Sequence, residues 1–228
     1  MVIRGLPPKR QERVEHNMPI QTAWSKKPVY RVTKRALDVV LSGAAIVGLS
    51  PVLAACAVAV RTTSPGPVLF RQVRSGQYLQ EFEMLKFRTM RVDTPELPSH
   101  MINANDWLTP VGGFLRKTSL DELPQLVNIL KGDMSIIGPR PPLPSQTDLI
   151  EERAKYGAND VPVGLSGWAQ VNGRDELPIA VKAKLDGEYA AMASLALDAK
   201  IVFMTVAKVF RHEGVVENEV PEPEGAAQ

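Results

Sequence analysis

The chain has 228 residues, a length that suggests one or two domains. Its 27 Lys and Arg residues nearly balance its 25 Asp and Glu residues, and the net charge of +2 indicates no polyelectrolyte partner such as a nucleic acid. The only cysteine is Cys56, which excludes an internal disulfide framework and a cysteine-based zinc site. The three histidines are far apart in the sequence, so a His-rich metal site is not expected.

Residues 1–32 are polar, basic and proline-containing, and they hold no apolar stretch of the kind found in signal peptides. They predict a flexible basic N-terminal arm. Residues 214–228 end in VPEPEGAAQ and predict a disordered tail.

Residues 33–62 contain the one long apolar run, LDVVLSGAAIVGLSPVLAACAVAV. As one helix it would be about 36 Å long, enough to cross a bilayer core of about 30 Å. Ser50-Pro51 lies near its middle, where proline removes a hydrogen bond and kinks the helix. Lys and Arg, which prefer the cytoplasmic side, flank both ends of the run, and those that follow it are Arg61, Arg71 and Arg74. A re-entrant membrane helix is favoured, while a buried core helix and a transmembrane span remain as alternatives.

Residues 63–213 predict an α/β, mostly helical cytosolic domain. GPVLFRQV and FEMLKFRTM are typical of short strands, and DTPELPSHMINAND of a loop. Thr109 is expected to cap a helix in TPVGGFL. The segment PSQTDLIEERAKYG is expected to form a helix that Gly157 closes. The stretch 161–173 reads as irregular and 178–211 as mostly helical. The amphipathic end of 178–211, with its basic edges, either packs on the core or lies on an anionic membrane surface.

Two adjacent carboxylates lie in TSLDELPQL. Ser119 and Glu122 match a capping box, and a role in capping a helix would explain the presence of Glu122 without a catalytic function. However, Pro124 would lose a hydrogen bond in a helix that starts at Ser119, and would not in one that starts near Asp121. A helix beginning near Asp121 is therefore predicted, and its dipole favours the charged, nucleophilic or metal-binding form of that carboxylate. Its expected buried face is Leu123, Leu126, Val127 and Leu130.

Several cations lie in short segments bounded by proline or glycine, and arginine suits bidentate phosphate recognition. Each alone is more often a solvated surface charge. Together with the acidic pair and the apolar run they indicate a phosphate-bearing substrate at a membrane. Motifs of ATPases and dinucleotide-binding proteins are absent. The cations are Arg88, Arg116, Lys117, Arg140 and Arg174.

The chain resembles the bacterial sugar transferases, the small monotopic phosphoglycosyl transferases, over roughly residues 33–210. The matching segments are KRALDVVLS, LSPVLA, SPGPVLFRQVRSG, MLKFRTM, LTPVGGFLRKTSLDELPQLVNILKGDMSIIGPRPPLP, SGWAQVNGR and KLDGEYAAMASLALDAKI. Among the departures, VGLSGW lacks an arginine and a proline that are usual in the family.

The resemblance implies a reaction. A sugar 1-phosphate passes from a UDP-sugar to undecaprenyl phosphate with release of UMP, at the cytoplasmic face of the bacterial inner membrane. This step initiates the assembly of exopolysaccharide, capsule, O-antigen or a glycan. Inner-membrane lipid is an implied partner, and a homodimer and pathway glycosyltransferases are further ones. A catalytically silent membrane scaffold, and an enzyme that transfers sugar and releases UDP, are the competing interpretations. The sugar is open, with glucose or galactose expected first.

The resemblance also implies residue roles. Asp121 is the nucleophile and a ligand of Mg²⁺, and Glu122 completes the catalytic pair. Ser50 and Pro51 form the break that returns the membrane helix to the cytosol. The implied phosphate-binding residues are Lys86, Arg88, Arg116, Arg140 and Arg174.

Overall fold

The computed structural model describes residues 22–94, 104–173 and 177–211. Predictions for most of the N-terminal arm, for the C-terminal tail and for Arg174 lie outside these ranges. The same holds for the middle of the expected loop before residue 104.

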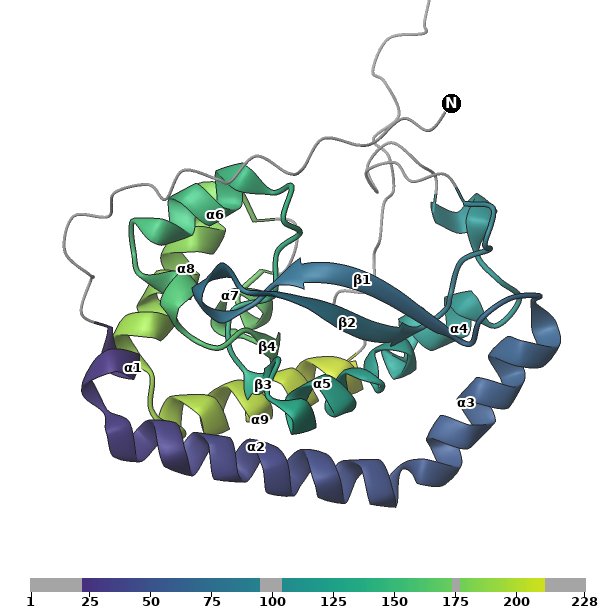
Figure 1. Cartoon of the computed structure of the whole chain (residues 1–228), viewed down its shortest axis with the longest axis horizontal. Helices are drawn as coiled ribbons and strands as arrows, with labels where there is room; N and C mark the ends of the chain where they lie inside the picture. The colour runs from purple at the N-terminus through teal and green to yellow at the C-terminus, as the bar shows by residue number, and fades with distance from the viewer. Residues whose placement is uncertain (1–21, 95–103, 174–176, 212–228) are drawn as a thin grey trace, which may run out of the picture.

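A long bent pair of helices runs along one edge of an α/β body (Figure 1). The pair consists of α2 (Pro28–Gly48) and α3 (Ser50–Thr63). An antiparallel hairpin, β1 (Leu69–Ser75) and β2 (Glu81–Phe87), and a short parallel pair, β3 (Ser135–Ile137) and β4 (Gly164–Ser166), form the strands. The other helices are α1 (Ala23–Lys26), α4 (Gly112–Lys117), α5 (Gln125–Lys131), α6 (Thr147–Ala154), α7 (Trp168–Val171), α8 (Ile179–Met192) and α9 (Leu195–Arg211).

The described residues confirm a mostly helical α/β body. Both strands of the hairpin and the helices within 147–154 and 178–211 lie where they were predicted. Two expectations were wrong. The Thr109 hydroxyl donates to the carbonyl of Thr89 and does not cap α4, which begins only at Gly112. The stretch 161–173 is not irregular, because β4 pairs there with β3 and α7 follows.

The predicted break in the apolar run is present. The axes of α2 and α3 differ by 63° across Leu49, and the Ser50 hydroxyl donates to the carbonyl of Val47 at 2.7 Å. Pro51 lies in the first turn of α3, where its missing amide costs no hydrogen bond. No single helix of the described chain has the length and apolarity to cross a membrane, although the bent pair meets both conditions together. Regular helix starts at Pro28, before the boundary expected at residue 33.

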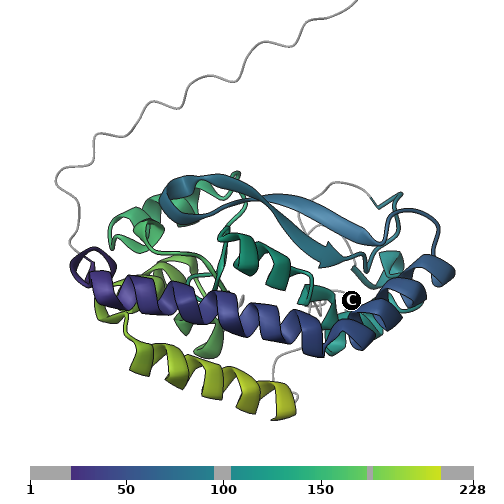
Figure 2. The same ribbon diagram turned by 60° about the horizontal axis from the view of Figure 1, so that its bottom comes forward.

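Polarity along α2 is the reverse of that in a water-soluble surface helix. Every fourth residue on its inner side is buried and polar, namely Tyr30, Lys34, Asp38 and Ser42. On its outer side apolar side chains are exposed, such as Val40 at 64% and Val47 at 75%. A buried core helix therefore does not describe α2. Figure 2 shows α2 and α9 side by side, below the hairpin and α5.

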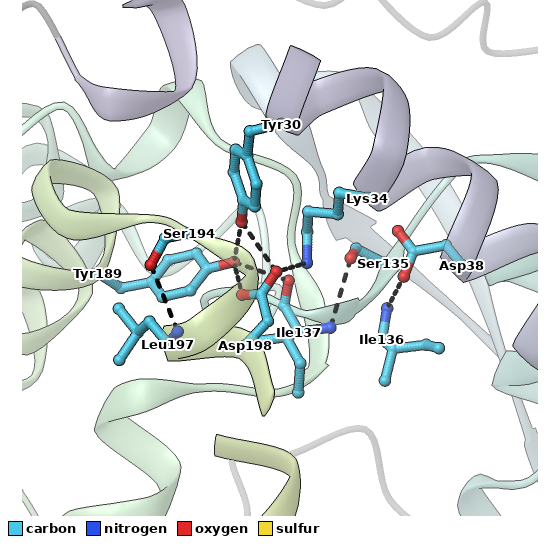
Figure 3. A network of polar contacts seen from close by, with 10 residues as sticks. All are labelled: Tyr30, Lys34, Asp38, Ser135, Ile136, Ile137, Tyr189, Ser194, Leu197 and Asp198. Carbon is cyan, nitrogen blue, oxygen red and sulfur yellow. Dashed lines mark hydrogen bonds and ion pairs between the residues drawn. The ribbon is translucent and has the colours of Figure 1, made fainter. Parts of the chain in front are cut away.

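A buried polar network joins α2 to the C-terminal helices (Figure 3). Both oxygens of the Asp198 carboxylate accept hydrogen bonds: Oδ2 from Lys34 Nζ and the Tyr30 hydroxyl, and Oδ1 from the Tyr189 hydroxyl, each at 2.9 Å. One turn further along α2, Asp38 Oδ1 accepts from the amide of Ile136 at 3.0 Å. The inner side of α2 is thus bonded to α9, α8 and β3.

A second set of contacts joins α2 to α5. The guanidinium of Arg35 donates to the carbonyls of Ile129 (2.6 Å) and Leu130 (2.8 Å), which lie in the last turn of α5, where few backbone amides remain as donors. Apolar packing continues this contact, because α2, α5 and the hairpin share one core cluster. Its buried members are Met84, Leu126, Ile129, Met134 and Val163.

We expect Lys34→Met to destabilise the fold strongly, because it leaves the Asp198 carboxylate buried without its cation. Breaking a buried pair in this way costs about 3–5 kcal/mol, and replacing both partners by apolar residues costs much less. Thermal unfolding in detergent should therefore show a large loss for Lys34→Met and a smaller one for Lys34→Met with Asp198→Leu. The control is Lys184→Met, which removes an exposed lysine of α8. An unfolding temperature of Lys34→Met equal to that of the control would contradict this account.

Candidate functional site

The acidic pair lies in a 3-10 turn, Leu120–Glu122, and not in the first turn of an α-helix as predicted. Ser119 before it has a positive φ of 56°, and α5 begins only at Gln125, directly after Pro124. Proline has no amide hydrogen, so a regular hydrogen-bond ladder cannot run through position 124. The capping box is not formed, because the Ser119 side chain makes no capping bond. The pair is thus held by a turn.

The face that α5 buries differs from the predicted one. Leu126 is buried as expected, whereas Leu130 is 40% exposed and Ile129 is fully buried instead. Asn128 is also buried: its Oδ1 accepts from the amide of Leu85 at 3.0 Å, and its Nδ2 donates to the carbonyl of Glu83 at 2.7 Å. The Asn128 side-chain amide therefore makes the hydrogen bonds to β2 that the backbone of a neighbouring strand would make. These bonds hold α5 against β2. This contact brings the end of β2 to the acidic pair.

Glu122 lies between two cations. Its Oε1 is 2.7 Å from Lys86 Nζ and 3.6 Å from Arg140 Nη1. Although burial opposes ionisation, Lys86 and then Arg140 hold the pKa of Glu122 below its usual value. The amide of Gln125 contributes to the same lowering. Glu122 is therefore an ionised carboxylate that positions Lys86 and Arg140 around the turn.

The pKa of Asp121 is shifted in the opposite direction to that of Glu122. Asp121 is only 8% exposed, and burial raises its pKa to about 6. The charge of Lys86 opposes this rise, that of Glu122 adds to it, and that of Arg116 opposes it. No α-helix begins at Asp121, so the predicted helix dipole does not set the pKa of this carboxylate, and the loss of surrounding water raises that pKa. With a pKa of about 6, Asp121 is still mostly ionised at neutral pH. The two neighbouring carboxylates have pKa values that are moved apart, a pattern typical of acid–base pairs in active sites.

Arg116 is placed by close packing around Thr89. A Cβ at Gly112 would lie 2.0 Å from the carbonyl oxygen of Thr89, so only glycine lets α4 start against this strand end. One turn later, Arg116 Nε donates to the Thr89 hydroxyl at 3.0 Å. Thr89 follows Arg88 in the same segment and was not singled out by the sequence.

Arg88 is used differently from the prediction. It is buried, and its guanidinium donates to the carbonyls of Ser64 (2.8 Å) and Pro65 at the end of α3. These bonds connect the C-terminus of α3 to β2, and they favour a structural role for Arg88 over a contact with phosphate.

Arg140 is held by its backbone. The loop from Gly138 meets β4 so closely that a Cβ at Gly138 would lie 2.1 Å from the carbonyl oxygen of Pro162. The Gly138 amide donates to the carbonyl of Ser166 at 2.9 Å. The carbonyl of Arg140 accepts from Arg153 at 3.0 Å, and Arg153 is itself paired with Asp186 at 2.6 Å. The loop is therefore fixed, and the Arg140 side chain, 36% exposed, extends from it.

The structure also places residues at the site that the sequence did not indicate. A shallow recess beside the acidic pair, here called the Arg74 recess, is lined by Arg74, Met84, Gln125, Arg140, Pro141 and Gly164. Arg74 had been read only as a cation flanking the apolar run, and it lies on β1. Gln125 follows Glu122 by three residues, a spacing that puts side chains on one side of a turn and offered the only sequence signal.

The donor set fits a magnesium ion held jointly with a substrate. Within the described ranges, no group of three or more His, Cys, Asp or Glu side chains forms a complete metal site. Mg²⁺ commonly takes one or two protein carboxylates and completes its shell with water and substrate phosphates. The buried carboxylate of Asp121 is a hard oxygen donor of that kind, and a bound cation would offset the rise in its pKa.

The chain is similar to known proteins over most of its length. A family model described as "Bacterial sugar transferase" matches residues 29–212. Over 190 residues the chain is 42% identical to the UDP-glucose:undecaprenyl-phosphate glucose-1-phosphate transferase of Escherichia coli, covering 80% of this chain and 41% of that protein. A UDP-N-acetylgalactosamine-undecaprenyl-phosphate N-acetylgalactosaminephosphotransferase of Aeromonas hydrophila is 38% identical, with 78% and 44% covered. The chain thus spans about two fifths of the length of these relatives.

A shorter relative is covered almost completely. The exopolysaccharide production protein ExoY of Sinorhizobium fredii is 33% identical over 204 residues, which are 82% of this chain and 90% of that protein. Together, the family model and these relatives show that the chain belongs to the bacterial sugar transferase family.

Proposed function

We propose that the chain transfers a sugar 1-phosphate from a UDP-sugar to undecaprenyl phosphate and releases UMP. The names of several relatives describe such phosphotransferases. The observation that carries the proposal is a buried carboxylate of raised pKa, Asp121, next to Glu122, whose carboxylate lies against Lys86 and Arg140. The Asp121 carboxylate is suited to act as a nucleophile, and Lys86 and Arg140 are suited to bind phosphate.

In the proposed first step, an Asp121 oxygen attacks the β-phosphorus of the UDP-sugar. A bond forms between that oxygen and phosphorus, the bond to the bridging oxygen breaks, and UMP departs with the electron pair. In the second step a phosphate oxygen of undecaprenyl phosphate attacks the same phosphorus and restores the Asp121 carboxylate. A covalent intermediate lets a soluble donor and a membrane-bound acceptor use one site in turn.

The neighbouring residues have distinct proposed duties. Lys86, Arg116 and Arg140 surround the acidic turn and would stabilise the negative charge of the transferring phosphate. Glu122 is kept ionised by Lys86, which suits it to position cations better than to accept a proton. When bound, Mg²⁺ would neutralise the diphosphate, with Asp121 as its protein ligand. Arg174 remains a predicted phosphate ligand outside the described residues.

The polarity of α2 supports a proposed place at the cytoplasmic face of the inner membrane. Its exposed valines and leucines would face lipid, while its buried polar side contacts the catalytic body. The bend at Leu49 would return α3 to the same side, so that α2 and α3 form a re-entrant pair. On α9, exposed apolar side chains such as Val202, Phe203 and Val206 would lie at the lipid surface.

Asp121→Asn is expected to abolish UMP release in purified protein supplied with Mg²⁺, UDP-glucose and undecaprenyl phosphate, because an amide cannot form the acyl phosphate. UDP-glucose is the first donor to test, since the E. coli relative is named for it. Asp106→Asn, at an exposed site, is the matched control and should retain activity. Full activity in Asp121→Asn would refute the covalent step, and release of UDP would refute phosphosugar transfer.

The same variant should not be less stable than the natural chain. The pKa of Asp121 is raised in the folded state, so ionisation of Asp121 opposes folding as pH rises from about 4 to 6, and the full cost is present above about 6. Removing the charge should therefore stabilise the protein at pH 8 without divalent cations, by up to about 3 kcal/mol.

The rate of UMP release should depend on the ionisation of Asp121. Below a pH of about 6 the carboxyl group is increasingly protonated and cannot attack phosphorus, so the single-turnover rate should fall about tenfold per pH unit. Above that pH the rate should level off. Measuring the profile at two Mg²⁺ concentrations tests the cation, which should move the midpoint to lower pH. A rate that is constant from pH 5 to pH 7 would exclude Asp121 as the titrating nucleophile.

Replacing Ser50 by Ala and Pro51 by Leu should straighten the bent pair, because it restores the amide hydrogen and removes the serine bond to Val47. In cells, membrane-impermeant labels should reach neither end of the natural chain and should reach one end of the double variant. Val58→Leu, within α3, serves as the control. Labelling of one end of the natural chain from outside would refute the re-entrant arrangement.

A further inference from the structure

The hydroxyl group of Thr89 is buried against the side chain of Arg116. Thr89 is 7% exposed, and its Oγ1 accepts a hydrogen bond from Arg116 Nε at 3.0 Å. A hydrogen bond from a charged donor is stronger than one between neutral groups, and it restricts a long side chain to one orientation. Because the guanidinium is planar and Nε is its nitrogen nearest the backbone, this bond sets the direction in which the two terminal nitrogens point.

The backbone of Thr89 is fixed relative to α4, so its hydroxyl group has a fixed place. The Thr89 carbonyl accepts from the amide of Thr109 at 2.9 Å and from the Thr109 hydroxyl at 3.3 Å. The Thr109 carbonyl in turn accepts from the amide of Gly112, the first residue of α4, at 2.8 Å. Gly112 packs directly on the Thr89 carbonyl, and a larger residue would not fit there. The helix that carries Arg116 therefore starts in contact with Thr89.

Arg116 is joined to the acidic turn through its backbone as well. The Arg116 carbonyl accepts from the amide of Ser119 at 3.0 Å, and the Ser119 carbonyl accepts from the amide of Glu122 at 3.3 Å. The acidic turn also packs against both α4 and β2. Thr89 follows the end of β2 by two residues, so its hydroxyl connects the Arg116 side chain to a second element that contacts the turn.

We infer that Thr89 is a positioning residue for the reaction, whose hydroxyl group holds the Arg116 guanidinium in the orientation that meets the transferring phosphate. The inference rests on the proposed function for the role of Arg116. In an active site a displacement of about 1 Å can lower the rate about a hundredfold, so a bond that orients a charged side chain before the substrate arrives contributes to the rate. A threonine that served only the fold would contribute through its shape and its methyl group, and the hydroxyl would not affect the rate.

The first test separates the hydroxyl group from the shape of the side chain. Thr89→Val keeps the shape and removes the hydroxyl, whereas Thr89→Ser keeps the hydroxyl and removes the methyl group. With Mg²⁺, UDP-glucose and undecaprenyl phosphate, we expect Thr89→Val to lower kcat for UMP release about tenfold or more, and Thr89→Ser to lower it less than about threefold. The control Thr147→Val, at an exposed threonine of α6, should match the natural chain. An unchanged kcat in Thr89→Val, or a larger loss in Thr89→Ser, would overturn the inference.

The second test asks whether Thr89 acts through Arg116. Arg116→Lys keeps a positive charge but places a methylene group where arginine has Nε, so the bond to the hydroxyl is lost. Thr89→Val should then lower kcat less than about twofold in the Arg116→Lys chain, although it lowers kcat about tenfold or more when Arg116 is present. A residue that served only the fold would give the same loss in both chains, together with a lower unfolding temperature in both. That result would refute the positioning role.

The two proposals fail in different ways. If the natural chain releases no UMP from any UDP-sugar, the same four chains are compared by their equilibrium affinity for UDP-glucose. A loss of affinity in Thr89→Val that occurs only when Arg116 is present would then overturn the proposed function alone. Normal UMP release with independent effects at the two positions overturns the positioning role alone. No UMP release together with independent effects on the affinity overturns both.

Discussion

The buried carboxylate of Asp198 is the interaction on which the arrangement of this protein depends. It is the acceptor for Lys34 and Tyr30 of α2 and for Tyr189 of α8, so one side chain of α9 connects its neighbour α8 to α2, a helix from the other end of the sequence. A charge in this position is tolerated only because a cation and two hydroxyls satisfy it. The consequence is that α2 turns its polar side inward and leaves its apolar side exposed. The polarity that supports a membrane location and the attachment of the body to α2 are thus two results of the same contact.

The site is built outward from this anchored helix. Arg35 holds the end of α5, Asn128 holds α5 to β2, and the end of β2 brings Lys86 to Glu122. A separate chain of contacts, from the buried Arg153–Asp186 pair to the backbone of Arg140, brings the second cation. Because both cations reach the same carboxylate, Glu122 stays ionised, while its buried neighbour Asp121 has a raised pKa. Under the proposed function, Glu122 organises charge and Asp121 performs the covalent step.

Much of the local structure could be predicted because its causes are local. The hairpin followed from two apolar segments rich in strand-forming residues, and the break at Ser50-Pro51 followed from the chemistry of proline. The start of α5 was predicted three or four residues too early, because the 3-10 turn before Pro124 keeps a helical appearance without the α-helical ladder. The partners of Arg88 could not be predicted for another reason. They are the carbonyls of Ser64 and Pro65, which come from a distant helix end that no spacing rule reveals.

The sequence by itself determined the family, the apolar run with its break, and the identity of the acidic pair, because these depend on residue types and short spacings. Only the tertiary structure decided which carboxylate is buried and which is paired, since burial and ion pairing depend on segments brought together from across the chain. It also decided that Arg74 and Gln125 lie beside the acidic pair. Arg74 reaches this place through the hairpin register, and Gln125 through the turn that precedes α5, contacts that depend on how distant segments pack.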